Sequence, residues 1–201
     1  VQREASTATY AILRRALSNE AITPGRTTLM DVHYWITAEW KRQGFEFNFP
    51  ASLDLQRVGG ITLDDAADPV IEPGDLLHVD FGVRTSGIVA DQQKMAYVLR
   101  DGETAPPDGL VRAFESSKRA AGLVLEAMEV GRMGADIKRL AETAAAAAGI
   151  FGDLGLGLPK LGSPLFQQFA RFGVILLPAG AAASEEVITI VGGVVLAVGI
   201  V

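Results

Sequence analysis

The chain has 201 residues, of which 49% are apolar and 21% are charged, a composition typical of a globular protein with one substantial core. Its net charge of −6, without any basic run, excludes a surface that follows the phosphates of nucleic acids. The chain has no cysteine, which excludes disulfides and thiolate metal sites and is in keeping with a cytoplasmic protein.

The N-terminal segment predicts a pair of helices. Apolar residues at helical spacing indicate a first helix from about Gln2 to Asn19. A second helix is expected to begin at Thr28, where Asp31 completes a capping-box pattern, and to end at Gly44. The expected apolar faces are Tyr10, Leu13 and Leu17 in the first helix, and Leu29, Val32, Ile36 and Trp40 in the second. His33, beside the second face, is interpreted as a packing residue.

Strand patterns follow. Alternating polar and apolar residues from Phe45 to Arg57 predict a strand. A Pro-Gly-Asp turn then leads into a strand from Leu76 to Phe81, and another strand is expected from about Ile88 to Leu99. The polar face of the first strand is typical either of a cleft lining or of a solvated sheet surface. That face consists of Ser52, Asp54 and Gln56.

A second helix pair is predicted after the strands. Its first helix carries an apolar stripe, and its second runs from Gly134 to Ala148. The connection Glu129–Ile137 (EVGRMGADI) echoes Thr23–Val32 (TPGRTTLMDV), which joins the first pair. The echo predicts an α/β (α+β) domain with two pseudo-twofold αα-β halves, whose second set of strands follows residue 150. The stripe consists of Leu110, Phe114, Ala121, Leu125 and Met128.

The last fifty residues differ in character from the rest. Charge falls and glycine rises after Gly149, which is typical of a buried half-sheet and equally of a divergent sequence. Strands are expected near Gly173–Leu177 and Val187–Val198, the latter folded into a docked hairpin at Gly192-Gly193. The apolar run Val187–Val201 is shorter than the roughly 20 residues that span a bilayer, so no membrane association is expected.

Two acids stand out in the segment Ile71–Leu99. Asp80 lies in the middle of one predicted strand, and Asp91 lies early in the next, across a glycine-containing turn. Two adjacent antiparallel strands can direct both carboxylates to one point, and divalent metals accept such oxygens. The alternative is that both are turn-flanking acids paired with Arg84 or Lys94.

The sequence PGDLLHVDFGVRTSGIVADQQKMAYVL resembles the pita-bread metallopeptidases, the family of methionine aminopeptidase, Xaa-Pro dipeptidase and creatinase. ITPGRTTLMDV before it and VGRMGADI after it match family landmarks in the same order. The likeness covers residues 1–149 of a single domain spanning 1–201 and is strongest to Xaa-Pro dipeptidases and aminopeptidases. It implies that Asp80 and Asp91 bind two divalent ions (Mn, Co or Zn), with Asp91 bridging them.

Residues 150–201 depart from the family pattern. The family places a His in a Gly-rich loop and two Glu on later strands, whereas Leu156 stands where the His is expected. Glu185 and Glu186 fall near the first Glu, and no acid follows them. Glu185 is therefore a candidate ligand, and so is His78, two residues before Asp80; the alternative for His78 is a hydrogen-bonded structural role.

The resemblance implies an exopeptidase that hydrolyses an N-terminal peptide bond of a short peptide with a metal-activated water. It is compatible with a cytoplasmic, manganese-dependent homodimer. The missing ligands predict poor turnover by this chain. The alternative function is an inactive or truncated pita-bread module that binds a peptide or a protein, with no nucleic-acid partner.

Overall fold

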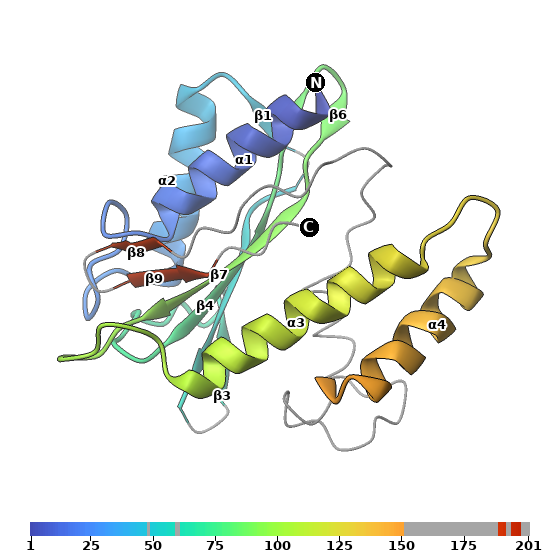
Figure 1. Ribbon diagram of the computed structural model, residues 1–201. Coiled ribbons are helices and arrows are strands. Elements are labelled where there is room, and N and C mark those ends of the chain that lie inside the picture. The colour runs from blue at the N-terminus through green and yellow to red at the C-terminus, as the bar shows by residue number, and fades with distance from the viewer. Residues whose placement is uncertain (48, 59–60, 151–188, 192–193, 198–201) are drawn as a thin grey trace. The chain divides into compact units, whose positions relative to one another are not determined.

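The computed structural model describes residues 1–47, 49–58, 61–150, 189–191 and 194–197 (Figure 1). The chain divides into two compact units: residues 1–106 with 185–198, and residues 107–184 with 199–201. Among the described helices, none has the length and apolar character needed to cross a membrane. The predicted strand near Gly173–Leu177 lies outside the described residues.

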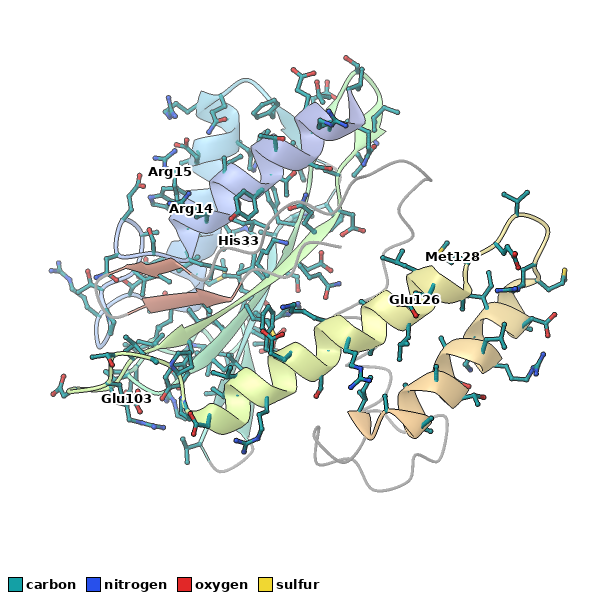
Figure 2. The ribbon with its side chains drawn as sticks, in the orientation of Figure 1. Arg14, Arg15, His33, Glu103, Glu126 and Met128 are labelled. Carbon is teal, nitrogen blue, oxygen red and sulfur yellow. The ribbon has the colours of Figure 1, made fainter. Side chains whose placement is uncertain are left out.

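Two helices open the first unit. Helix α1 spans Gln2–Ala16, and α2 spans Leu29–Arg42. The predicted capping box is present, because the Thr28 hydroxyl accepts from the Asp31 backbone N–H and the Asp31 carboxylate accepts from the Thr28 N–H. Arg15, labelled in Figure 2, joins the two helices by a salt bridge to Glu39.

The main sheet is antiparallel, with the strand order β3-β2-β4-β7-β9-β8. Helix α1 packs against β4 and β7, and α2 packs against β2, so the helices cover one face of this sheet (Figure 1). Its six strands are β2 (Ser52–Arg57), β3 (Ile61–Asp64), β4 (Leu76–Phe81), β7 (Gln92–Val98), β8 (Thr189–Val191) and β9 (Val194–Ala197).

A second, smaller sheet has the order β1-β5-β6. Its strands are short; β1 precedes β2 in the sequence, and β5 and β6 lie between β4 and β7. The strand predicted over residues 45–57 is therefore wrong in its continuity, because its first part pairs with β5 in the small sheet and its second part with β4 in the main sheet. The strands are β1 (Glu46–Phe47), β5 (Val83–Thr85) and β6 (Ile88–Val89).

The core lies between the two helices and the covered face of the main sheet. Alternation along β4 places one set of side chains there and the other set on the opposite face. The predicted helix faces are buried except at Tyr10 and Trp40, which are half-buried and pack against the core. The Trp40 ring centroid is 4.8 Å from that of Phe47. The large core side chains include Ile12, Leu13, Leu29, Val32, Ile36, Leu55, Leu77, Val79 and Phe81.

The second unit contains a helix pair, α3 (Asp108–Ala127) and α4 (Gly134–Ala147), which confirms both predicted helices. The two helices pack against each other. The buried residues of both helices are small, and two of them, Ala141 and Ala145, lie one turn apart on α4. The alanine tract thus supplies a close helix contact as well as helix propensity.

The predicted C-terminal hairpin is present. Strands β8 and β9 pair antiparallel, with Val191 opposite Val194. Strand β9 continues the main sheet beside β7, with Val194 opposite Val98. The hairpin therefore docks on the sheet of the N-terminal helices, and its backbone groups on that side are paired.

Candidate metal centre

Asp80 lies on the face of β4 that the helices do not cover. The flanking residues Val79 and Phe81 are fully buried in the core, and Asp80 is half-buried on the other side. Strand β4 runs between β2 and β7, with Ser52 and Gln93 directly opposite Asp80. The central position in the sheet fixes the backbone at Asp80 from both sides, which a ligand-binding carboxylate requires.

Gly82 allows the chain around Asp91 to approach this point. A Cβ atom added at Gly82 would lie 1.3 Å from the Ala90 carbonyl oxygen and 3.1 Å from the Asp91 Cα. The Ala90 N–H donates to the Val83 carbonyl oxygen at 3.0 Å, which holds the two segments together. Only glycine fits where two backbones approach this closely. The glycine two residues after Asp80 is thus a condition for bringing Asp91 beside it.

The strand predicted from Ile88 to Leu99 is interrupted at this crossing. Its first part is β6, its second part is β7, and Ala90 and Asp91 lie between them. Asp91 therefore stands just before β7 rather than within a strand, and it is exposed. The interruption arises because Ala90 is hydrogen-bonded to Val83 in the small sheet, while Gln92 is already opposite Phe81 in the main sheet.

The Asp91 carboxylate lies close enough to that of Asp80 to influence its ionisation. Burial raises the pKa of Asp80 to about 6, and the charge of Asp91 acts in the same direction. The charge of His78 and the hydrogen bond from Gln93 oppose this rise. When both are ionised, the pair is a local concentration of negative charge that favours a cation.

The free oxygen of Asp80 fits such a cation. Oδ2 accepts a hydrogen bond from the Gln93 side-chain amide at 3.1 Å, whereas Oδ1 is buried and has no hydrogen-bond partner among the described residues. Buried polar atoms nearly always have a partner, so Oδ1 is suited to a ligand. Hard divalent ions prefer such carboxylate oxygens.

Within the part of the chain that the structure describes, no group of three or more His, Cys, Asp or Glu could hold a metal ion. Asp80 and Asp91 thus form a two-acid site, and two acids alone bind metal weakly. The other positions considered for ligands, Leu156, Glu185 and Glu186, lie outside the described residues. Ligation by Glu185 remains a prediction.

His78 lies on the same face of β4 as Asp80, and both of its ring nitrogens are hydrogen-bonded. Nδ1 is 2.8 Å from the Asp54 Oδ2, and Nε2 is 3.1 Å from the Gln93 Oε1. A role as a metal ligand would require His78 to give up one of these bonds. Sequence reasoning missed Gln93; the only signal was its position two residues after Asp91 on a predicted strand.

The remaining polar candidates are accounted for by structure. Lys94 is buried on the helix-covered face, with its ammonium 5.9 Å from the centroid of the Tyr10 ring, so it does not face Asp80. Arg84 lies exposed on β5. His33, labelled in Figure 2, donates from Nδ1 to the Ala51 carbonyl oxygen at 2.9 Å, in keeping with the packing role predicted for it.

Comparison with known proteins gives the same fold. The model of metallopeptidase family M24 matches residues 2–174. No curated protein matches the chain. Among solved structures, an X-Pro aminopeptidase from Thermotoga maritima is 18% identical, with a TM-score of 0.58, over 74% of this chain and 40% of the other. An Xaa-Pro dipeptidase from Bacillus anthracis is 20% identical, with a TM-score of 0.57, over 74% and 40%.

A zinc-substituted E. coli aminopeptidase P in complex with product is 16% identical, with a TM-score of 0.61, over 85% of this chain and 37% of the other. At these identities the likeness concerns the fold, which is the pita-bread fold that the sequence predicted. The chain spans about two fifths of the length of the structures that it matches.

Proposed function

Because the chain belongs to metallopeptidase family M24, we propose that Asp80 and Asp91 are metal ligands of an exopeptidase of the Xaa-Pro dipeptidase or aminopeptidase type. The observation that carries the proposal is the pair itself: Gly82 allows the Asp91 backbone to cross close to β4, and the buried Oδ1 of Asp80 has no partner among the described residues. The Xaa-Pro substrate class of the proposal is taken from the matching X-Pro aminopeptidase and Xaa-Pro dipeptidase.

The described residues would contribute binding and charge to this reaction. The site would take divalent ions, in the proposal a pair of manganese ions, whose chemistry would be Lewis acidity toward a scissile carbonyl and a water molecule. Asp80 and Asp91 would hold the ions with hard oxygen donors, and the hydrogen bond from Gln93 keeps Asp80 oriented. Glu185, the further ligand predicted from the sequence, lies outside the described residues.

The test is Mn²⁺ binding by the full chain after treatment with a chelator. Free Mn²⁺ is measured by electron paramagnetic resonance during a titration of the wild type, Asp91→Asn and the control Asp101→Asn. Asp101 is an exposed acid in the loop after β7, so its replacement removes the same charge away from the site. We expect Asp91→Asn to weaken binding by more than the roughly tenfold that loss of a supporting partner causes. Equal binding by all three proteins would refute the proposal.

Hydrolysis of an Xaa-Pro dipeptide in the presence of Mn²⁺ separates the peptidase from the alternative, a non-catalytic module. The alternative is favoured by the two-acid character of the described site. Turnover that disappears in Asp91→Asn supports the peptidase. Mn²⁺ binding without turnover supports a module that has kept the metal ligands of the family and binds peptide without cleaving it.

A further inference from the structure

A line of hydrogen-bonded side chains crosses three strands on the uncovered face of the main sheet. Asp54 on β2 is opposite His78 on β4, and Asp80 on β4 is opposite Gln93 on β7. His78 Nδ1 is 2.8 Å from the Asp54 Oδ2, and its Nε2 is 3.1 Å from the Gln93 Oε1. The Gln93 Nε2 donates to the Asp80 Oδ2 at 3.1 Å. The line ends on a proposed metal ligand.

The direction of each bond follows from the groups involved. An ionised Asp80 only accepts, so Gln93 must present its amide nitrogen to Asp80 and its oxygen to His78. The Gln93 oxygen and the Asp54 carboxylate both accept, so His78 donates to each of them as an imidazolium with both ring nitrogens protonated. Asp80 and this form of His78 thus favour the same orientation of the Gln93 amide. In the opposite orientation, the amide oxygen would face the Asp80 carboxylate and repel it.

The two oxygens of Asp80 are consequently not equivalent. Oδ2 is held by Gln93, while the buried Oδ1 has no partner among the described residues. A carboxylate fixed by one oxygen cannot rotate freely about its χ2 bond, and its second oxygen keeps one position. Such outer hydrogen bonds orient ligands and typically change metal affinity by about 10- to 100-fold when removed.

We propose that Gln93, held in one orientation by His78 and Asp54, is a positioning residue that presents the Asp80 Oδ1 to a divalent cation. The inference rests on the proposed metal site. It assigns His78 a place in the support of the site, and it gives Gln93, a residue with no evident role in the sequence, a part in metal binding. Gln93 acts through Asp80 and does not itself contact the ion.

The experiment is a double-mutant cycle with Mn²⁺ affinity as its measurement, using the full chain as wild type, Gln93→Leu, His78→Leu and the double variant. We expect Gln93→Leu to weaken Mn²⁺ binding by about 10- to 100-fold. His78→Leu should weaken it less, because Gln93 stays but loses its fixed orientation. In the Gln93→Leu background, His78→Leu should have almost no further effect, because the two residues act in series.

Gln56→Leu is the matched control. Gln56 lies on β2, is half-buried on the same face of the sheet, and is outside the line of hydrogen bonds. Its replacement should leave Mn²⁺ affinity unchanged. Urea unfolding of each metal-free protein identifies a variant that is merely destabilised. If Gln93→Leu does not fold, His78→Leu still tests the line of hydrogen bonds from Asp54 to Asp80 (the relay), because it should lower Mn²⁺ affinity.

The outcomes separate the relay from the metal site. Wild-type affinity in Gln93→Leu, or in His78→Leu where that variant replaces it, would overturn the relay, as would additive effects of the two substitutions. Either result leaves the metal site intact if Asp91→Asn still weakens Mn²⁺ binding by more than about tenfold. Absence of Mn²⁺ binding by the wild type, or equal binding by Asp91→Asn, would overturn the proposed metal site and the relay with it.

Discussion

Lys94 is a buried lysine whose removal should stabilise the protein at neutral pH. Its side chain is 6% exposed, between Tyr10 of α1 and the covered face of the sheet. Burial lowers the pKa of Lys94 from 10.5 to about 8. One pKa unit corresponds to about 1.4 kcal/mol, so the shift corresponds to about 3 kcal/mol of destabilisation at pH 7.

The pH dependence has a definite sign. Between pH 8 and 10.5 the unfolded chain still binds the proton that the folded chain has lost, so stability rises with pH in that window. Below pH 8 the destabilisation is fully present, and above 10.5 it is gone. Lys94→Met keeps the length of the side chain without its charge. It loses the contact of the ammonium with Tyr10, worth about 0.5–2 kcal/mol, so the net gain at pH 7 is about 1–3 kcal/mol.

Urea unfolding at several pH values from 7 to 10 measures this effect. The difference in unfolding free energy between Lys94→Met and wild type should fall by roughly 2.5 kcal/mol across that range. The comparison cancels the titration of groups that both proteins share. Lys138→Met, which replaces a lysine that is 65% exposed, gives the general effect of removing one positive charge. A difference that stays constant from pH 7 to 10 would refute the assignment of the pKa shift to burial.

Two further substitutions test close contacts of the fold, one at Gly82 beside the site and one at Arg57, at the other end of β2. Gly82→Ala should lower the free energy of unfolding by about 3 kcal/mol, because its Cβ would lie 1.3 Å from the Ala90 oxygen, and should weaken Mn²⁺ binding at least about tenfold. The control is Gly122→Ala, in open space on α3, which should stabilise the protein by up to about 1 kcal/mol. Arg57→Leu should cost about 3–5 kcal/mol in urea unfolding, because it leaves Asp75, which is 1% exposed and accepts two 2.8 Å bonds from Arg57, without its cation. An effect below 1 kcal/mol in either Gly82→Ala or Arg57→Leu would contradict the contact on which it rests.

Local sequence signals predicted the elements whose structure depends on neighbours in sequence. The capping box at Thr28 and the strand from Leu76 to Phe81 are present with the expected residues. Both depend on interactions that short patterns encode: a side chain three residues from a helix start, and alternation at period two. The pairing of β8 with β9 follows the same rule, since a glycine pair between two runs of β-branched residues predicts a hairpin.

The prediction of one continuous strand over residues 45–57 and another over 88–99 was wrong, because whether a strand continues depends on pairing partners that are distant in sequence. Phe47 pairs with Val83, whereas Leu53 pairs with Val79, so the run divides between two sheets. The strand β5 was missed for the related reason that it lies between Gly82 and Gly87, where the glycines suggested only a turn. Gly82 instead permits the close crossing of two backbones, which no alternation pattern contains, whereas Gly87 does lie in a turn, with a φ of +76°.

The start of β7 explains why the site could be located from sequence but not completed. The run Asp91-Gln92-Gln93-Lys94 is polar throughout, so the hydrophobic pattern assigns no face to any of its four residues. In the structure, two of them face helix α1: the Gln92 side-chain amide donates to the Ser6 carbonyl oxygen at 3.1 Å, and Lys94 lies near the Tyr10 ring. The other two, Asp91 and Gln93, lie on the opposite face beside Asp80.

A shift of β7 by one residue would exchange these faces, placing Lys94 toward Asp80 and turning Asp91 and Gln93 toward the core. Such a shift would bury a carboxylate and an amide without the partners that they have in the observed register, at a cost of several kcal/mol. The hydrogen bonds of Gln92 to α1 and of Gln93 to Asp80 therefore help to set the register of β7. In this strand, the polar groups that support the candidate site also specify the fold around it.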